Sequence, residues 1–429
     1  MKIHIYDEFG PQDTAMMQAL YSRSPLSAAE HVKKVKKTGS GNFMKKFYVG
    51  YGHASIADCG STTMFIEGVS ILADKAIQDW PLYSGQETST RYIDMSKQPI
   101  IDPKGTKFSK TILDRWMQFY VSSQEAVKIH LKEKYPKKEN EGEEVYEKAI
   151  NARSFDILRG FLPAGITTQL SWHTNLRQAA DKLALLRHHP LPEVKNIAKE
   201  ILSKLKVKYP ESFCQQYTKR QEAFWKRSVE KYNYFKPLGK ENFVLYSTVK
   251  RSELMAYKDI LSSRPEKTGL PLFLGDLGQI QFRFKLDFGS FRDIQRHRNG
   301  VCRMPLLTAN RGFNQWYLDQ LPKELQKEAK NLIALQKKEI SRLNVPAEIK
   351  QYYIALGFNV DCQVTYPLPA AVYVVELRSS RYVHPTLRKI AHQMYEALKK
   401  KFPELKMNVD LQPDDWDVRR GLQDIYVKK

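Results

Sequence analysis

The chain has 429 residues, of which 42% are hydrophobic and 11% aromatic, a composition typical of a soluble globular protein. This length can form two or three domains, the alternative being one large core. No apolar run approaches the roughly 20 residues of a membrane span, and the chain start lacks the apolar core of a signal peptide, so we expect a cytoplasmic protein without membrane attachment. The net charge of +22 predicts a surface that attracts anions, such as nucleotides, folates, flavin phosphates or nucleic acid.

Cysteines and histidines are placed in a way that argues against two classes of site. The four cysteines, Cys59, Cys214, Cys302 and Cys362, are widely separated, so we expect reduced, mostly buried thiols and neither a disulfide framework nor a cysteine-based zinc site. His173, His188 and His189 have no partners at metal-ligand spacing. The sequence therefore assigns no metal.

The first half of the chain begins with short predicted elements. These are a strand at Ile3–Tyr6 and helices at Ala15–Leu20 and Ala28–Lys36. A long apolar stretch, Met64–Ala76, follows, and Pro81 should end any helix there. Leu82–Tyr92 is then a loop dense in hydroxyl, amide and charged groups. Apolar residues at helical spacing predict further helices over 109–134 and Val194–Tyr209.

After about residue 235 the pattern restarts. Leu277–Phe288 alternates, with Phe282, Phe284, Leu286 and Phe288 on one face and Gln281, Arg283, Lys285 and Asp287 on the other, which predicts a half-buried strand. Helices are predicted at Pro322–Leu343 and Pro385–Lys400.

Two stretches far apart in the sequence carry the candidate chemistry. Arg296-His297-Arg298 places two fixed cations around an imidazole, which suits phosphates or an electron-rich ring. Ser84–Tyr92 offers hydroxyl, carboxylate and guanidinium groups at close spacing. The alternative for each stretch is a solvated basic or polar turn.

Together with Gly52-His53-x-Ser55, Arg159-x-x-Leu162-Pro163 and Asn175-x-Arg177, these stretches resemble the flavin-dependent thymidylate synthases, which methylate dUMP using FAD and methylenetetrahydrofolate. The resemblance spans almost the whole chain, as two copies. It implies an α/β protein of the α+β type with two tandem repeats, 1–235 and 236–429, each a mixed sheet with flanking long helices.

The two copies have lost different parts of the family pattern. The first has Asp79-Trp80-Pro81 in place of Arg-His-Arg, and Asp58-Cys59 in place of Glu-His. The second keeps Arg-His-Arg and a late segment, Glu376-Leu377-Arg378 followed by Leu387-Arg388, in register with the family. It departs from the family at most other elements: Val301 and Leu306 replace loop serines, Gln351 replaces Arg before Leu-Pro, and Thr365–Pro369 replaces Thr-x-Asn-x-Arg. We expect each copy to donate the part it keeps to a shared site; the alternative is a relative whose chemistry is lost or changed.

The resemblance also implies roles for individual residues. Those implied for dUMP are Ser84, Gln86, Glu87, Ser89, Arg91, Arg159, Arg187 and Arg296, with Arg91 and Arg187 catalytic. Those implied for FAD are His53, Ser55, Asn175, Arg177, Arg296, His297 and Arg298. Arg378 has no surviving partners in its own copy, so it is either a site residue or a structural remnant.

The leading hypothesis is an FAD-dependent methyltransferase that converts dUMP to dTMP, with methylenetetrahydrofolate and NADPH as co-substrates. The alternatives are a diverged relative that binds or modifies uracil in nucleic acid, and a non-catalytic basic nucleotide-binding protein. The +22 charge permits nucleic acid, although the motifs favour small ligands. The resemblance implies an assembly like the family's tetramer of single-copy subunits. A chain with two copies is therefore expected to form a homodimer of pseudo-tetrameric shape.

Overall fold

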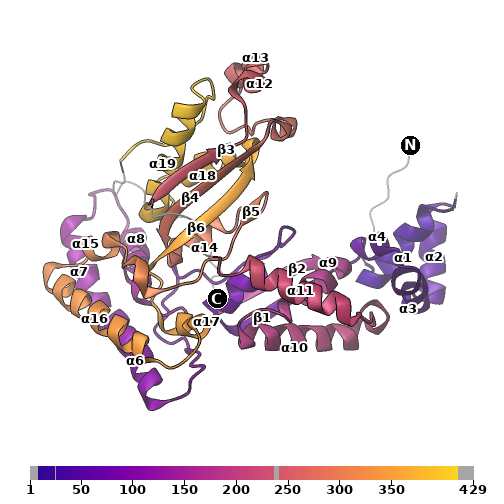
Figure 1. Cartoon of the computed structure of the whole chain (residues 1–429), viewed down its shortest axis with the longest axis horizontal. Coiled ribbons are helices and arrows are strands. Elements are labelled where there is room, and N and C mark those ends of the chain that lie inside the picture. Colours follow the sequence, from indigo (N-terminus) through magenta and orange to yellow (C-terminus); the bar gives the residue numbers. More distant parts are fainter. Residues whose placement is uncertain (1–7, 25, 236–240, 414–429) are drawn as a thin grey trace. The chain divides into compact units, whose positions relative to one another are not determined.

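The computed structural model of the chain describes residues 8–24, 26–235 and 241–413 (Figure 1). Helices dominate, with two small sheets among them, as expected for the α+β type. The strand predicted at Ile3–Tyr6 lies outside the described residues, as does residue 236, where the second repeat was expected to begin.

The chain forms two compact units. The first comprises Met1–Glu67, Ala76–Glu87 and Gln169–Tyr232, and the second comprises Gly68–Lys75, Thr88–Thr168 and Asn233–Lys429. These units do not follow the repeat boundary expected at 235/236, because the second unit includes two segments from the first half of the chain.

The first unit is mainly helical. Its early elements are α1 (Pro11–Tyr21), α2 (Ala28–Thr38), α3 (Gly41–Phe43), the π-helix η1 (Met44–Gly50) and α4 (Ala54–Asp58). Its later elements are α9 (Leu176–Leu186), α10 (Pro192–Lys208), the 3-10 turn η3 (Pro210–Ser212) and α11 (Lys219–Tyr232). The predicted helices at Ala15–Leu20 and Ala28–Lys36 are confirmed within α1 and α2, and α2 begins at a capping box between Ser27 and Glu30.

Strands β1 (Ser61–Ser70) and β2 (Thr167–Asn175) form a two-stranded sheet. The apolar stretch Met64–Ala76 divides between the end of β1 and the helix α5 (Ile71–Gln78). The helix ends before Pro81, as predicted, since proline cannot continue it.

The second unit contains a four-stranded sheet in the order β3-β4-β6-β5. Its strands are β3 (Phe243–Ser247), β4 (Gln279–Asp287), β6 (Asn359–Pro367) and β5 (Val301–Cys302). All of its strand pairs are antiparallel, which differs from the mixed sheet implied by the resemblance. Helices α18 (Leu368–Arg378) and α19 (Pro385–Lys401) pack against it (Figure 1).

Other helices complete this unit. The larger ones are α6 (Lys107–Ser122), α7 (Gln124–Lys134), α8 (Glu143–Leu158), α14 (Phe288–Ile294) and α16 (Lys323–Arg342). The shorter helices and 3-10 turns are η2 (Arg159–Phe161), α12 (Arg251–Met255), α13 (Lys258–Ser263), η4 (Leu272–Leu277), η5 (Ala309–Arg311), α15 (Gln315–Asp319), α17 (Ala347–Lys350) and η6 (Gln351–Tyr353). The helices predicted at Pro322–Leu343 and Pro385–Lys400 are thus confirmed as α16 and α19.

Strand β4 has the predicted inner face, with Phe282, Phe284 and Leu286 buried. Asp287, expected on the opposite face, is instead fully buried. Its carboxylate accepts hydrogen bonds from the Ser290 amide (2.8 Å) and from the Tyr317 hydroxyl (2.8 Å), because it caps the first turn of α14.

The same run of elements occurs twice along the chain. In each half a three-residue 3-10 turn (η2, η6) precedes a nine-residue strand (β2, β6), an eleven-residue helix (α9, α18) and a 17-residue helix (α10, α19). Equal lengths in the same order indicate a tandem duplication.

Within the second unit, the turn Gly160–Gly165, which begins inside η2, pairs with the turn Tyr352–Gly357, which begins inside η6. Four backbone hydrogen bonds join them in reciprocal fashion: Leu356 N to Leu162 O, Ala164 N to Ile354 O, Gly357 N to Gly160 O, and Gly165 N to Tyr352 O, at 2.7–2.9 Å. A Cβ on Gly165 would lie 2.8 Å from Tyr352 O, and one on Gly357 would lie 2.8 Å from Gly160 O. The approach of the two backbones therefore requires glycine at both corresponding positions.

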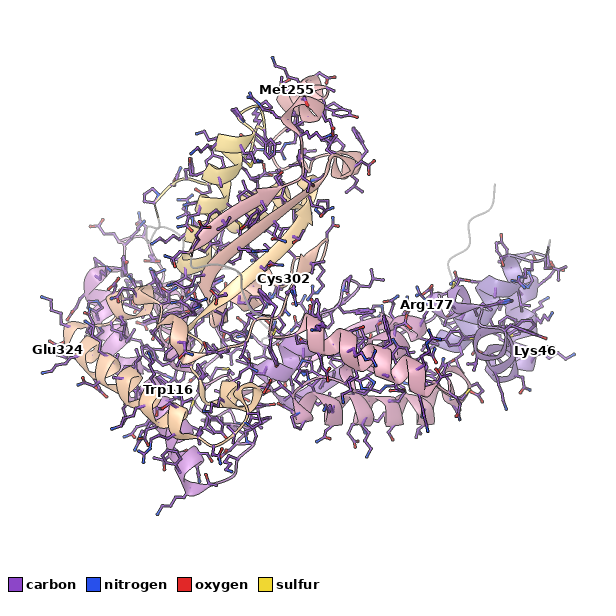
Figure 2. The ribbon with its side chains drawn as sticks, in the orientation of Figure 1. Lys46, Trp116, Arg177, Met255, Cys302 and Glu324 are labelled. Carbon is purple, nitrogen blue, oxygen red and sulfur yellow. The ribbon has the colours of Figure 1, made fainter. Side chains whose placement is uncertain are left out.

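Trp116 on α6, labelled in Figure 2, holds α6 against these paired turns. The side chain is completely buried, and its Nε1 donates a hydrogen bond to Tyr353 O (2.9 Å). A buried indole normally finds such a partner, so α6 is fixed to the backbone of the second turn.

Candidate functional site

The Arg-His-Arg motif follows directly on α14, and α14 is tied to residues from the first half of the chain. Gln295 Nε2 donates to Lys75 O (3.3 Å), and the Arg292 guanidinium donates to Thr90 Oγ1 (3.0 Å). Both contacts lie within the second compact unit and are buried. The motif therefore starts from a rigid support.

Asp293, on the last turn of α14, is the carboxylate around which the arginines gather. Arg159 NH1 lies 3.8 Å from Asp293 Oδ2, and an Arg378 NH2 group donates to Asp293 O (2.6 Å). Burial alone would raise the pKa of Asp293, but Arg296, Arg159, Arg378 and Arg91 together lower this pKa to about 2. Two of these arginines come from each half of the chain, so both halves contribute to one charge cluster.

His297 is a neutral imidazole with a defined tautomer. Burial and the nearby Arg378 charge lower its pKa to about 3. Arg378 Nε donates to His297 Nε2 (2.7 Å), which leaves the ring proton on Nδ1. The ring also makes an edge contact with Tyr373, with centroids 6.1 Å apart. The partner of Arg378 thus lies in its own half, contrary to the expectation that none survives there.

The motif lines a cavity of about 510 Å³. Its cationic and polar lining consists of Arg296, His297, Arg298, Asn299 and Arg378. Its apolar and aromatic lining consists of Gly269, Leu270, Leu272, Tyr366, Pro369, Ala370, Tyr373, Val374 and Leu377. A concave site with cations on one part and rings on another suits an anionic ligand that carries an aromatic group.

Arg91 and Arg159, predicted to bind dUMP, lie in this unit but are already engaged. Arg91 makes two hydrogen bonds to Asp156 (2.7 and 3.3 Å) and one to Tyr382 O (3.3 Å). Burial and the Arg159 charge lower the pKa of Arg91 to about 10, well above neutrality. Arg159 is 1% exposed and donates to Ser290 Oγ (2.7 Å).

The other residues predicted for dUMP on the Ser84–Tyr92 stretch are held by hydrogen bonds that partly involve the backbone. His173 N donates to Ser84 O (2.7 Å), and the Gln86 amide donates to Ser171 Oγ (3.1 Å), so this part of the loop follows β2 in the first unit. Glu87 accepts from Gln78 Nε2 (2.6 Å). Ser89, which belongs to the second unit, accepts from the Arg91 amide (3.2 Å).

The four FAD residues predicted from the first copy belong to the first unit, whereas the residues that line the Arg-His-Arg cavity belong to the second. Asn175 caps α9 by accepting from Gln178 N (2.8 Å). Arg177, labelled in Figure 2, pairs with Asp58 (2.7 Å) and Asp181 (3.5 Å). His53 stacks on Phe47, and Ser55 O accepts the Cys59 thiol.

Arg187, predicted to be catalytic, is also in the first unit and has protein partners. Its guanidinium lies 2.7 Å from Glu222 and over the rings of Tyr217 (4.7 Å) and Trp225 (5.3 Å). An ion pair and two cation-π contacts stabilise its positive charge within the protein. Among the described residues, this arrangement fixes α11 to the end of α9.

Asp79-Trp80-Pro81, the counterpart of Arg-His-Arg, is bonded to α9. Trp80 Nε1 donates to Gln178 Oε1 (2.8 Å), and Lys182 Nζ donates to Asp79 O (2.6 Å). Burial lowers the pKa of Lys182 to about 8. Gln178 and Lys182 occupy the positions on α9 that Ala370 and Val374, both lining the cavity, occupy on α18.

Of the predicted residues, the structure brings together Arg91, Arg159, Arg296, His297 and Arg298, through Asp293 and Arg378. Sequence reasoning missed Asp293, Tyr373 and the role of Arg378. Asp293 could have been found, because it precedes Arg296 by three residues and helical spacing brings such a pair together.

The described residues form neither a metal site nor a membrane span. No group of three or more His, Cys, Asp or Glu there could hold a metal ion, and no helix there is long and apolar enough to cross a membrane. All four cysteines are free; Cys302 and Cys362 are buried, whereas Cys214 is exposed and Cys59 is half-buried. The expectation of mostly buried thiols therefore holds for two of them.

Comparison with known proteins gives a family match within the first half of the chain. Residues 6–211 match the family model described as thymidylate synthase complementing protein. The UPF0159 protein of Chlamydia muridarum (strain MoPn / Nigg) is 25% identical over 416 residues, covering 82% of this chain and 77% of that protein. The UPF0159 protein Ta1429 of Thermoplasma acidophilum is 23% identical over 445 residues, covering 85% and 87%. These matches extend well into the second half, and the names state no activity.

The charge cluster predicts a pH-dependent contribution to stability. The folded pKa of Asp293, about 2, lies below the unfolded value of about 3.9, so its stabilisation is full above the unfolded pKa and is lost as the pH falls through the folded pKa. Asp293→Asn should lower the free energy of unfolding by about 2 kcal/mol at pH 7, and the gap should shrink below about pH 4. Urea unfolding at several pH values measures this, with the exposed Asp114→Asn on α6 as control. A gap independent of pH would contradict the assignment.

Proposed function

We propose that this chain, whose residues 6–211 match the family model of the thymidylate synthase complementing protein, is a flavin-dependent methyltransferase that converts dUMP to dTMP with methylenetetrahydrofolate, FAD and NADPH. The observation that carries the proposal is the 510 Å³ cavity lined by Arg296, His297 and Arg298. The family match supplies the reaction class, and the cavity supplies a place for an anionic aromatic ligand.

The lining residues fit a flavin nucleotide in charge and chemistry. Arg296 and Arg298 would hold its phosphates, because a guanidinium offers several donors and stays charged. Tyr366 and Tyr373 with the neighbouring aliphatic side chains would contact the ring. The volume lies within the roughly 300–1,000 Å³ usual for ligand sites. When bound, the flavin would supply the redox step of the methylation.

The protein groups around the cavity would bind and orient. His297 keeps its proton on Nδ1 and is held by Arg378, so it can donate one hydrogen bond without carrying charge. Asp293 holds the arginines of both halves in one cluster, and Arg91 and Arg159 would act on the dUMP anion from there. The excess of arginines over carboxylates keeps the cluster positive, which favours a phosphate ligand.

A second candidate is a nucleotide-binding protein without methyl transfer. The observation that favours it is that Arg91, Arg159 and Arg187, the three arginines implied for uracil or its phosphate, all have protein partners. An arginine that must leave a buried carboxylate to reach a substrate loses a charge-assisted pair. If these arginines keep their protein partners, the cavity would bind a nucleotide and the protein would not transfer a methyl group.

Two measurements on the purified protein separate these functions. Visible absorbance of bound flavin reports the cofactor, and chromatographic detection of dTMP from dUMP, in the presence of FAD, NADPH and methylenetetrahydrofolate, reports the reaction. Flavin binding with dTMP formation supports the enzyme. Flavin binding without dTMP supports the second candidate, and the absence of flavin binding contradicts the first.

Ligand contributions should divide between the two halves of the chain. Arg298→Ala should weaken flavin binding about ten- to a hundredfold, since one charge-assisted contact is lost. Arg91→Ala should weaken dUMP binding by a similar factor and leave flavin binding largely unchanged. Isothermal titration of both ligands measures this. Lys330→Ala, an exposed charge on α16, is the control, and equal losses for both ligands in both variants would argue against the division.

We further propose a homodimer of pseudo-tetrameric shape that binds about one flavin per chain. The tandem duplication supports the dimer, because two chains would supply the four repeats of a single-copy tetramer. The internal bonds of Asp79 and Trp80 support one flavin per chain, since that motif already contacts α9. Light scattering with flavin titration tests both points; a monomer of 49.9 kDa would overturn the dimer.

A further inference from the structure

Helix α11 (Lys219–Tyr232) has two chemically different faces. Glu222, Trp225 and Val229 point inward: Glu222 pairs with Arg187 and His188, Trp225 packs on Tyr217 and Arg187, and Val229 is buried. This spacing of three and four residues marks one face of the helix. The inner face is therefore committed to the first unit.

The opposite face carries an exposed ring between two cations. Arg220, Phe224 and Arg227 follow one another at helical spacing, and Lys231 continues the row. Phe224 is 67% exposed. Within the part of the chain that the structure describes, no ion pair or hydrogen bond engages the guanidinium of Arg220 or Arg227. We call Arg220, Phe224, Arg227 and Lys231 the α11 stripe.

We infer that the α11 stripe is a binding surface for single-stranded nucleic acid. An exposed aromatic ring flanked by guanidinium groups can stack on an unpaired base while the cations contact adjacent phosphates. Stacking of this kind tolerates any base, so the stripe would bind the strand with little sequence preference. The inference does not depend on the methyltransferase proposal, since the stripe lies on a different compact unit from the Arg-His-Arg cavity.

The charge around the stripe fits a polyanion. Helix α11 has five basic residues, Lys219, Arg220, Lys226, Arg227 and Lys231, and two acidic ones, Glu222 and Glu230. Glu222 is on the inner face, where it is paired, and Glu230 lies on the flank. A membrane surface would require a continuous apolar face, whereas Phe224 stands alone among charges. A nucleic acid strand uses both the ring and the cations.

The test is fluorescence anisotropy of a fluorescein-labelled oligouridylate with the full-length protein. Phe224→Ala should weaken binding about five- to a hundredfold, and Phe224→Tyr should retain it, because tyrosine also stacks. Arg220→Ala with Arg227→Ala should reduce the slope of log affinity against log salt by about 1.4. Lys330→Ala, which removes an exposed charge in the second unit, is the matched control.

The outcomes are distinct. Loss on Phe224→Ala with recovery in Phe224→Tyr supports the inference. Equal binding by wild type and Phe224→Ala, or equal competition by heparin for both, would show charge attraction only and would overturn it. Since Phe224 is on the surface, circular dichroism of each variant should match wild type, so weaker binding would not reflect unfolding.

Discussion

The reciprocal pairing of two turns, Gly160–Gly165 and Tyr352–Gly357, is the constraint on which the second unit depends. Each turn hydrogen-bonds to its own counterpart, which is the arrangement expected when duplicated segments meet around a local twofold axis. The second turn also binds the start of α14, through Gly289 N to Leu356 O (2.9 Å). Arg159 lies at the beginning of the first turn and reaches Ser290 on α14 (2.7 Å). The junction thus brings an arginine of one copy to the helix that leads into the motif of the other.

Electrostatics then determines what this junction can hold. Several buried or half-buried arginines would repel one another and lose hydration, a cost that carboxylates must offset. Asp293 and Asp156 provide that compensation, the first for the whole cluster and the second for Arg91. Arg296 and Arg298 project from the end of the cluster toward the cavity. The positive charge that remains there can serve a ligand, because the deeper charges are already balanced within the protein.

The local sequence pattern predicted the helices, the strands and the Arg-His-Arg motif, but it did not predict which distant residues they contact. The alternation in β4 and the apolar spacing of α16 and α19 are local signals, so these elements could be predicted from sequence. Met64–Ala76 could not be divided between a strand and a helix, because a short apolar run fits either. The burial of Asp287 could not be predicted from the alternation, because it follows from the role of this residue as the cap of α14. The partners of Arg91, Arg159 and Arg378 are Asp156, Ser290 and His297, which lie 65 to 131 residues away along the chain, so local spacing does not show them.

The two copies of the motif differ because the helix beside each one presents different side chains. Next to Arg-His-Arg, α18 presents Ala370 and Val374, which are short and apolar and leave the cavity open. Next to Asp79-Trp80-Pro81, α9 presents Gln178 and Lys182 at the same positions, and these bond to the Trp80 indole and the Asp79 carbonyl. A buried lysine needs such an acceptor, since an unpaired charge there would be costly. The change in the motif and the change in the facing helix are therefore coupled. Restoring Arg-His-Arg alone in the first copy would place two arginines beside the Lys182 ammonium. The packing of the first copy thus depends on the residues that replace Arg-His-Arg there.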